Sequence, residues 1–227
     1  MTTGLDSPKF SQRLLAEFGA FPRKGIVLIG LVCAAAQVCG VMLWSKPNAS
    51  PVIYVILAAT LLAWFCVSYT TTSAILNVPP SVSGLLKFLA TSLLVSLPVL
   101  FSLALLVFAT KTSIGIVYVL SGLLMLGSIV LLPLLAGWPI TQAISTRLIG
   151  PMTALRATKG HRGNLIVAAL VFAGLNRAVP ALNSATNFAT ACLFAVIGLI
   201  AGIVGAMALI SIAVVASQMM SANLARK

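Results

Sequence analysis

Long apolar stretches without any acidic residue dominate the sequence from residue 25 onward. The only two acidic residues, Asp6 and Glu17, both precede the first of these stretches. The chain is 60% hydrophobic and 7% charged, whereas roughly a quarter of the residues in a typical soluble domain are charged. The sequence therefore predicts an all-α, polytopic integral membrane protein whose helices form a bundle.

Six apolar runs are candidates to cross a bilayer, whose hydrocarbon core is about 30 Å thick. The fifth run is the weakest, because only residues 165–175 are uninterrupted, which is too short to cross unaided. Either residues up to 182 complete this span, with Arg177 reaching toward the surface, or the segment is broken or re-entrant. The predicted spans are 25–44, 52–76, 84–110, 114–138, 164–182 and 189–216.

The basic residues fall unequally on the two sides of a six-span arrangement. Of the 14 Lys and Arg residues, eleven lie on the side that holds both termini; Lys46, Lys111 and Arg177 lie on the other. Cytoplasmic loops carry the excess of Lys and Arg, so both termini are predicted to be cytoplasmic. Five spans would weaken this asymmetry, which favours six. Small size and short loops suggest a bacterial inner membrane.

These spans divide the chain into three parts. Residues 1–24 form a basic, amphipathic N-terminal segment, residues 25–219 the six-helix membrane domain, and residues 220–227 a basic cytoplasmic tail. In the N-terminal segment, Phe10, Leu14, Phe18 and Phe21 recur at helical spacing. This pattern predicts a helix lying in the membrane interface, with a disordered tail as the alternative.

Residues 138–163, here called the central basic segment, separate the fourth and fifth predicted spans. Gly150 and Pro151 divide the segment into two amphipathic helices, predicted to lie at the cytoplasmic interface, and Gly160 is the expected stop of the second. The net charge of +12 is dispersed between apolar runs, so anionic lipids are favoured over nucleic acid as the partner. The candidate headgroup-binding residues are Arg147, Arg156, Lys159 and Arg162.

The second half of this segment resembles a known family. The sequence Gly150-Pro151-Met152-Thr153-Ala154-Leu155-Arg156, followed by Arg162-Gly163-Asn164 and an apolar run, is similar to a G-P-x-x-A-L-R-x-S segment that leads to T-R-G. That pattern is typical of the membrane domain of glycerophosphoryl diester phosphodiesterases and related stand-alone membrane proteins. Thr158 stands where the pattern has Ser, and the spacing to Arg162 is about one residue shorter. The resemblance implies a six-span membrane domain; with no phosphodiesterase domain attached, it implies no hydrolase activity.

Catalytic chemistry is not expected. With one histidine and no acidic residue after Glu17, neither a nucleophile–base pair nor paired carboxylates can be assembled in the membrane domain. His161 is interpreted as a loop histidine whose protonation is disfavoured by Lys159 and Arg162. We therefore predict no catalytic residue, no metal site and no cofactor. The four cysteines lie in apolar runs without a CxxC pair: Cys33, Cys39, Cys66 and Cys192.

The favoured function is that of a non-enzymatic accessory or scaffolding subunit, which packs within or beside a larger membrane complex. A stripe of small residues in the last span allows another helix to approach closely, although packing within the chain explains the stripe equally well. We expect membrane lipids, and either partner subunits or further copies of the chain, as partners. The stripe consists of Gly198, Gly202, Gly205 and Ala206.

Two other functions remain open. The first is lipid binding or lipid handling through the candidate headgroup-binding residues. The second is a small transporter or channel for a neutral or anionic solute, because polar residues within spans are often functional. Its polar intramembrane candidates are Gln37, Asn176, Arg177, Asn183 and Asn187.

Overall fold

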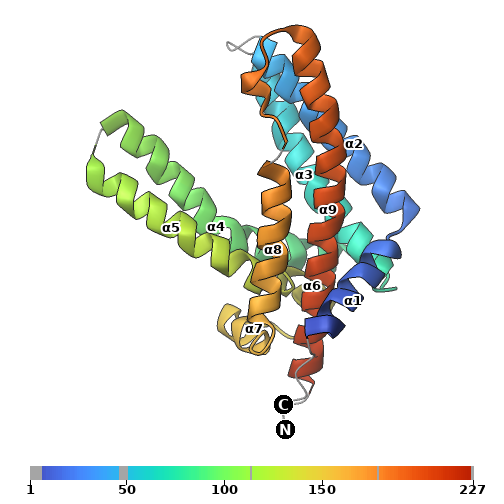
Figure 1. Ribbon diagram of the computed structural model, residues 1–227. Coiled ribbons are helices and arrows are strands. Elements are labelled where there is room, and N and C mark those ends of the chain that lie inside the picture. The colour runs from blue at the N-terminus through green and yellow to red at the C-terminus, as the bar shows by residue number, and fades with distance from the viewer. Residues whose placement is uncertain (1–6, 46–50, 113, 178, 226–227) are drawn as a thin grey trace.

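The computed structural model describes residues 7–45, 51–112, 114–177 and 179–225 (Figure 1). Helices and connecting loops make up this part of the chain, and it contains no strand, which confirms the all-α prediction. The elements are α1 (Ser7–Gly19), α2 (Arg23–Ser45), α3 (Pro51–Ile75), α4 (Val82–Thr112), α5 (Gly115–Leu135), α6 (Trp138–Ile144), α7 (Pro151–Ala157), α8 (Arg162–Arg177), the short 3-10 helix η1 (Leu182–Ser184) and α9 (Phe188–Leu224).

Five segments of the described chain are long and apolar enough to cross a membrane. They overlap the first four predicted spans and the last one, and they indicate a multi-pass membrane protein. The α8 helix is not among them: its 16 residues extend for about 24 Å, less than a bilayer core of about 30 Å. The five segments are Arg23–Ser45, Val55–Ile75, Val82–Thr112, Gly115–Ile144 and Phe188–Leu224.

The last helix, α9, is the central element of the bundle (Figure 1). Its 37 residues extend for about 55 Å, and it contacts α1, α2, α3, α6, α7 and α8. Asn187 starts the helix with a capping box: its side chain accepts a hydrogen bond from the Thr190 amide at 2.9 Å, and its own amide donates to the Thr190 hydroxyl at 3.1 Å. Met220 is fully buried, so the packed helix continues past the predicted boundary at 219.

One apolar core joins α2, α3, α4, α6 and α9. Its members include Ile29, Tyr69, Phe88, Ile140 and Val214. The Tyr69 hydroxyl also fixes the turn between α3 and α4, because it accepts a hydrogen bond from the Ser81 amide at 3.0 Å and donates to the Ser81 carbonyl at 3.2 Å.

The α4 and α5 helices form an antiparallel hairpin that diverges from the rest of the bundle (Figure 1). Two buried serines join the helices: the Ser102 hydroxyl donates to the Ser121 carbonyl at 2.8 Å, and the Ser121 hydroxyl donates to the Ser102 carbonyl at 2.9 Å. Hydrogen bonds of this kind hold membrane helices together. The hairpin contacts the rest of the bundle through α3, α6, α7 and α8.

The N-terminal segment folds as the helix α1, not as a disordered tail, over the residues that the structure describes. Phe10 is buried in a cluster with Leu165, Ile212 and Val215. The apolar side of α1 therefore packs on α8 and α9. Leu15 of α1 is 70% exposed, and the position of this helix in the lipid interface stays a prediction.

The central basic segment differs from the prediction in its first half. The α6 helix is buried from Trp138 to Gln142 and packs on α4 and α9, so it does not lie as an exposed helix at an interface. Residues 145–150 are not helical. The second predicted helix is observed as α7, with Pro151 in its first turn, and Gly160 beyond it has a φ of 104°, a conformation that favours glycine.

Candidate functional site

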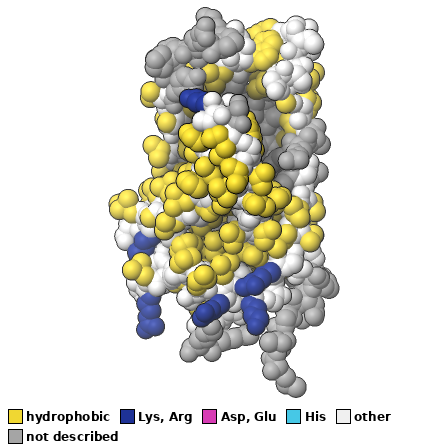
Figure 2. Space-filling view, turned by 90° about the vertical axis from the view of Figure 1, so that its left-hand side faces the viewer, with side chains coloured by type: hydrophobic (Ala, Val, Ile, Leu, Met, Phe, Trp, Pro, Cys, Tyr) yellow, Lys and Arg dark blue, Asp and Glu magenta, His cyan; other side chains and the backbone are white. Residues whose placement is uncertain are grey.

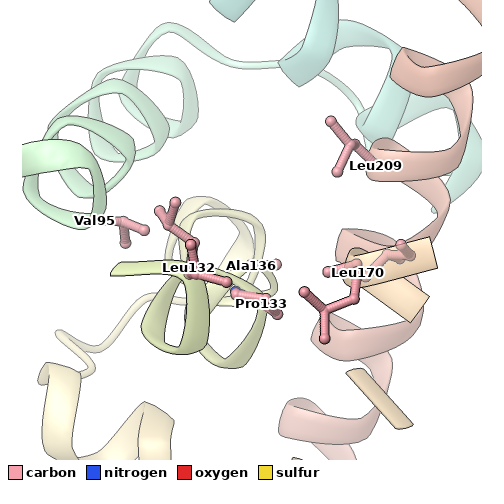
Figure 3. A pocket seen from close by; sticks show the side chains of 9 residues that line it. Val95, Leu132, Pro133, Ala136, Leu170 and Leu209 are labelled. Atoms are coloured by element: carbon pink, nitrogen blue, oxygen red, sulfur yellow. The ribbon is translucent and has the colours of Figure 1, made fainter. Parts of the chain in front are cut away.

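An apolar cavity of about 420 Å³ lies between the α4–α5 hairpin and the α8–α9 pair (Figure 3). We call it the lateral crevice. Its volume falls within the range of small-molecule sites, which is roughly 300–1,000 Å³, and every residue that lines it is apolar. None of the residues singled out from the sequence lines this crevice. Side chains from four helices meet there, among them Val95, Leu132, Pro133, Ala136, Leu170 and Leu209.

The short helix α7 connects the crevice to the central basic segment. Ala154 and Ala157 of α7 are buried in a cluster with Leu135 and Met220, and Val95 of the crevice packs against this cluster. Small alanine side chains allow α7 to lie close to α5 and α9, which it contacts. One face of α7 is therefore packed in the apolar interior beside the crevice. Its other face is exposed and carries Arg156.

All four candidate headgroup-binding residues are exposed. Arg156 lies on α7, Lys159 and Arg162 follow it, and Arg147 lies in the preceding loop. The Arg162 guanidinium donates a hydrogen bond to the Leu155 carbonyl at 2.8 Å, so this residue also stabilises the end of α7. Figure 2 shows several Lys and Arg side chains below a broad band of apolar side chains and another near the opposite end.

Few acidic residues are present to neutralise these basic side chains. Glu17 is the only acidic residue in the part of the chain that the structure describes, and its carboxylate accepts a hydrogen bond from Gln218 at 2.9 Å. The four candidate cations have no ion pair with a described residue. Their charge is therefore available to an external anion such as a lipid phosphate.

Two buried side chains that the sequence reasoning missed hold the loop that carries Arg147. The Gln142 amide donates to the Arg147 carbonyl at 3.0 Å and accepts from the Ile149 amide at 2.7 Å. The Trp138 indole donates to the Ile149 carbonyl at 2.8 Å. A glutamine and a tryptophan at the edge of an apolar run were the available signal, because such residues need a hydrogen-bond partner when they are buried.

Two further polar side chains hold the segment where α6 and α7 end. The Lys87 ammonium of α4 donates to the Ser145 carbonyl at 2.9 Å, so this residue is partly used within the protein. The Asn223 amide of α9 donates to the Ala157 carbonyl at 2.7 Å, at the end of α7. The backbone of the basic segment is thus held in place while its cationic side chains stay exposed.

The single histidine is buried next to this segment. His161 is 8% exposed, and its Nδ1 atom has no hydrogen-bond partner among the described residues. Burial lowers the pKa of His161, and the positive charge of Arg13 on α1 lowers this pKa further. The predicted direction is confirmed, but the causes differ from the predicted influence of Lys159 and Arg162.

We expect the protein to lose stability on acidification because of His161. The neutral imidazole is favoured in the folded state, so the unfolded chain binds the proton more readily than the folded chain. The contribution is therefore present above the ordinary histidine pKa of about 6.5 and is lost as the pH falls through the lower folded value. Thermal unfolding between pH 7.5 and 5 measures this loss, and His161→Asn should flatten the dependence. An equal slope in the variant would contradict the assignment.

The stripe of small residues in α9 faces α2. A Cβ atom at Gly198 would lie 2.9 Å from the Gln37 Nε2 atom, and one at Gly202 would lie 3.5 Å from the Cys33 sulfur. Gly205 and Ala206 are buried. The stripe is therefore used for packing within the chain.

The polar candidates for a transport path are spread over several elements. Gln37 lies on α2, Asn183 is exposed in η1, and Asn187 caps α9. No hydrogen bond joins any two of these three side chains in the described part of the protein. The side chains of Asn176 and Arg177 lie outside the described residues.

The described residues contain no group of three or more His, Cys, Asp or Glu side chains that could hold a metal ion. No protein-family model, curated protein or solved structure matches this chain. The resemblance to the membrane domain of glycerophosphoryl diester phosphodiesterases therefore stays a prediction. The lateral crevice and the adjacent basic segment are the features on which a function can be argued.

Proposed function

We propose that this protein binds an anionic phospholipid, with an acyl chain in the lateral crevice and the headgroup near Arg156 and Lys159. The observation that carries this proposal is the position of α7: its buried alanines pack beside the crevice, and its exposed side carries Arg156. An apolar site and a cationic site thus lie on opposite faces of one short helix. A phospholipid has the same succession of apolar and anionic parts.

The composition of the crevice supports a lipid over a polar solute. All of its lining residues are apolar, and a polar molecule would lose its hydrogen bonds to water without replacement there. An acyl chain has no such cost.

The structure gives less support to the other two functions. The accessory-subunit hypothesis relied on the small-residue stripe as a contact, and this stripe is occupied by α2. A transporter needs polar groups along a path, and Asn187, one of the candidates, is used as a helix cap. Both functions remain predictions without a surface that favours them.

The proposal includes six membrane crossings with both termini in the cytoplasm of a bacterial cell. After α8 ends, residues 179–187 continue toward the start of α9, where η1 contacts α2 and α9. The fifth crossing is then a helix followed by irregular chain that packs on α2 and α9 through η1. The candidate headgroup-binding residues on and near α7 face the cytoplasm, in accord with the excess of Lys and Arg on cytoplasmic loops.

Removal of two cations tests the proposal. Each basic residue near an anionic surface contributes about 1 kcal/mol, so Arg156→Ala combined with Lys159→Ala should weaken binding of phosphatidylglycerol about thirtyfold. Native mass spectrometry of the purified protein with phosphatidylglycerol or phosphatidylcholine measures this binding. The preference for phosphatidylglycerol should fall in the double variant.

Two further variants make the test specific. Arg23→Ala combined with Lys24→Ala removes the same charge from exposed positions at the start of α2, away from α7, and should retain the preference. Ala169→Trp fills the crevice without a change in charge and should weaken binding of both lipids. An equal loss in the two double variants, or full binding by Ala169→Trp, would contradict a site at α7 and the crevice.

A further inference from the structure

A second cavity, of about 410 Å³, lies between α2 and α9. Its lining comes from the second half of α2 and the first half of α9, so it is near the end of the bundle opposite to the basic segment. Most of the lining is apolar, with Val38, Met42, Val196 and Leu199 as examples. No charged side chain is among the residues that line it.

One amide side chain distinguishes this cavity from the lateral crevice. Gln37 lies on its wall, and no hydrogen bond joins this amide to any residue that the structure describes. Gln37 precedes Ser45 at the end of α2 by eight residues, or about 12 Å along the helix. At that depth, an amide without a partner costs free energy, since no water replaces the missing hydrogen bonds.

The packing of α2 on α9 keeps this amide in position. The Gln37 side chain lies against Gly198, where an added Cβ atom would come within 2.9 Å of Nε2 and 3.1 Å of Oε1. Only glycine leaves this space free. The other polar groups of the lining are less available, because the Ser45 hydroxyl already donates to the Met42 carbonyl at 3.0 Å.

We infer that this second cavity binds a neutral lipid that carries a hydroxyl or a carbonyl group, with diacylglycerol as the representative class. The Gln37 amide donates to a carbonyl and accepts from a hydroxyl, which removes the cost of leaving it unpaired. The described lining offers no cation to a phosphate, and a charge without a partner is expensive to bury, which favours a neutral lipid here. A site with one polar group in an apolar wall orients a ligand by that group.

A photoreactive diacylglycerol with a diazirine in its acyl chain tests this inference. The purified full chain is labelled in nanodiscs, and the labelled peptides are mapped by mass spectrometry. Labels are expected on residues 34–45 and 188–199, and unlabelled diacylglycerol should compete while phosphatidylglycerol should not. Gln37→Leu keeps an apolar surface but removes the amide, and should weaken labelling about tenfold, as expected for one hydrogen bond.

Two variants control this experiment. Gly198→Ala leaves Gln37 in the sequence but displaces its side chain, and should also reduce labelling. Gln218→Leu makes the same chemical change at a glutamine that pairs with Glu17, and should keep full labelling. Wild-type labelling of Gln37→Leu, equal competition by phosphatidylglycerol, or a dimer that depends on Gln37 would each overturn the inference. The result is independent of the proposed function, because Arg156→Ala combined with Lys159→Ala should leave this labelling unchanged.

Discussion

Gly137→Ala is expected to lower the free energy of unfolding by about 3 kcal/mol, the upper part of the usual cost of overpacking. Gly137 lies between α5 and α6, where the chain passes directly over α9. An added Cβ atom would lie 2.5 Å from the Ser217 nitrogen and 2.6 Å from the Ala216 carbonyl carbon. These are backbone atoms of the central helix, so they cannot move aside as a flexible side chain would.

Gly122→Ala provides the matched control for this prediction. Gly122 lies on α5 with open space around its Cβ position, and an alanine there favours the helix by up to about 1 kcal/mol. Unfolding of both variants in detergent, followed by circular dichroism during thermal or denaturant titration, compares the two changes. The same substitution should lower the free energy of unfolding at Gly137 and raise it at Gly122. Wild-type stability of Gly137→Ala would show that α6 does not pack on α9 as described.

The membrane helices could be predicted because their signal is local. An uncharged apolar run of sufficient length, such as residues 114–138, has few alternatives in any bilayer. The α8 helix shows the limit of this reasoning: it packs against α5 and α9, and length alone left a complete span and a broken segment both open. The placement of α1 shows a second limit, because an amphipathic pattern does not distinguish a lipid surface from a protein surface.

The lateral crevice could not be predicted, because its residues carry no distinctive signal. Val95, Leu132, Leu170 and Leu209 are ordinary apolar residues of membrane helices and lie far apart in the sequence. Their common role follows from the angle at which the α4–α5 hairpin leaves the bundle. That angle depends on the packing of α6 and α7, where the sequence analysis predicted two surface helices.

The buried position of Gln142 predicts the second large effect. Gln142 is 2% exposed, and its amide bonds two backbone groups of the loop at residues 145–150. Gln142→Leu would leave the Arg147 carbonyl and the Ile149 amide without their partner, and each such group costs about 1–3 kcal/mol. We therefore expect a loss of stability of about 2–4 kcal/mol. The loop should open together with this loss, since the Trp138 indole and the Lys87 ammonium are then its main remaining side-chain hydrogen-bond partners.

Limited proteolysis with trypsin measures that opening at a defined bond. Cleavage after Arg147 follows the population of the open loop when opening is fast, so a local cost of about 2 kcal/mol corresponds to cleavage about thirtyfold faster.

Trp138→Phe removes only the hydrogen bond to the Ile149 carbonyl and should have a smaller effect. Gln12→Leu, at an exposed position of α1, should change cleavage little, because surface substitutions usually alter stability by less than about 0.5 kcal/mol. Equal cleavage in all three variants would mean that Gln142 does not hold the loop. Ordered cleavage, fastest in Gln142→Leu, would show that a buried amide positions the exposed Arg147.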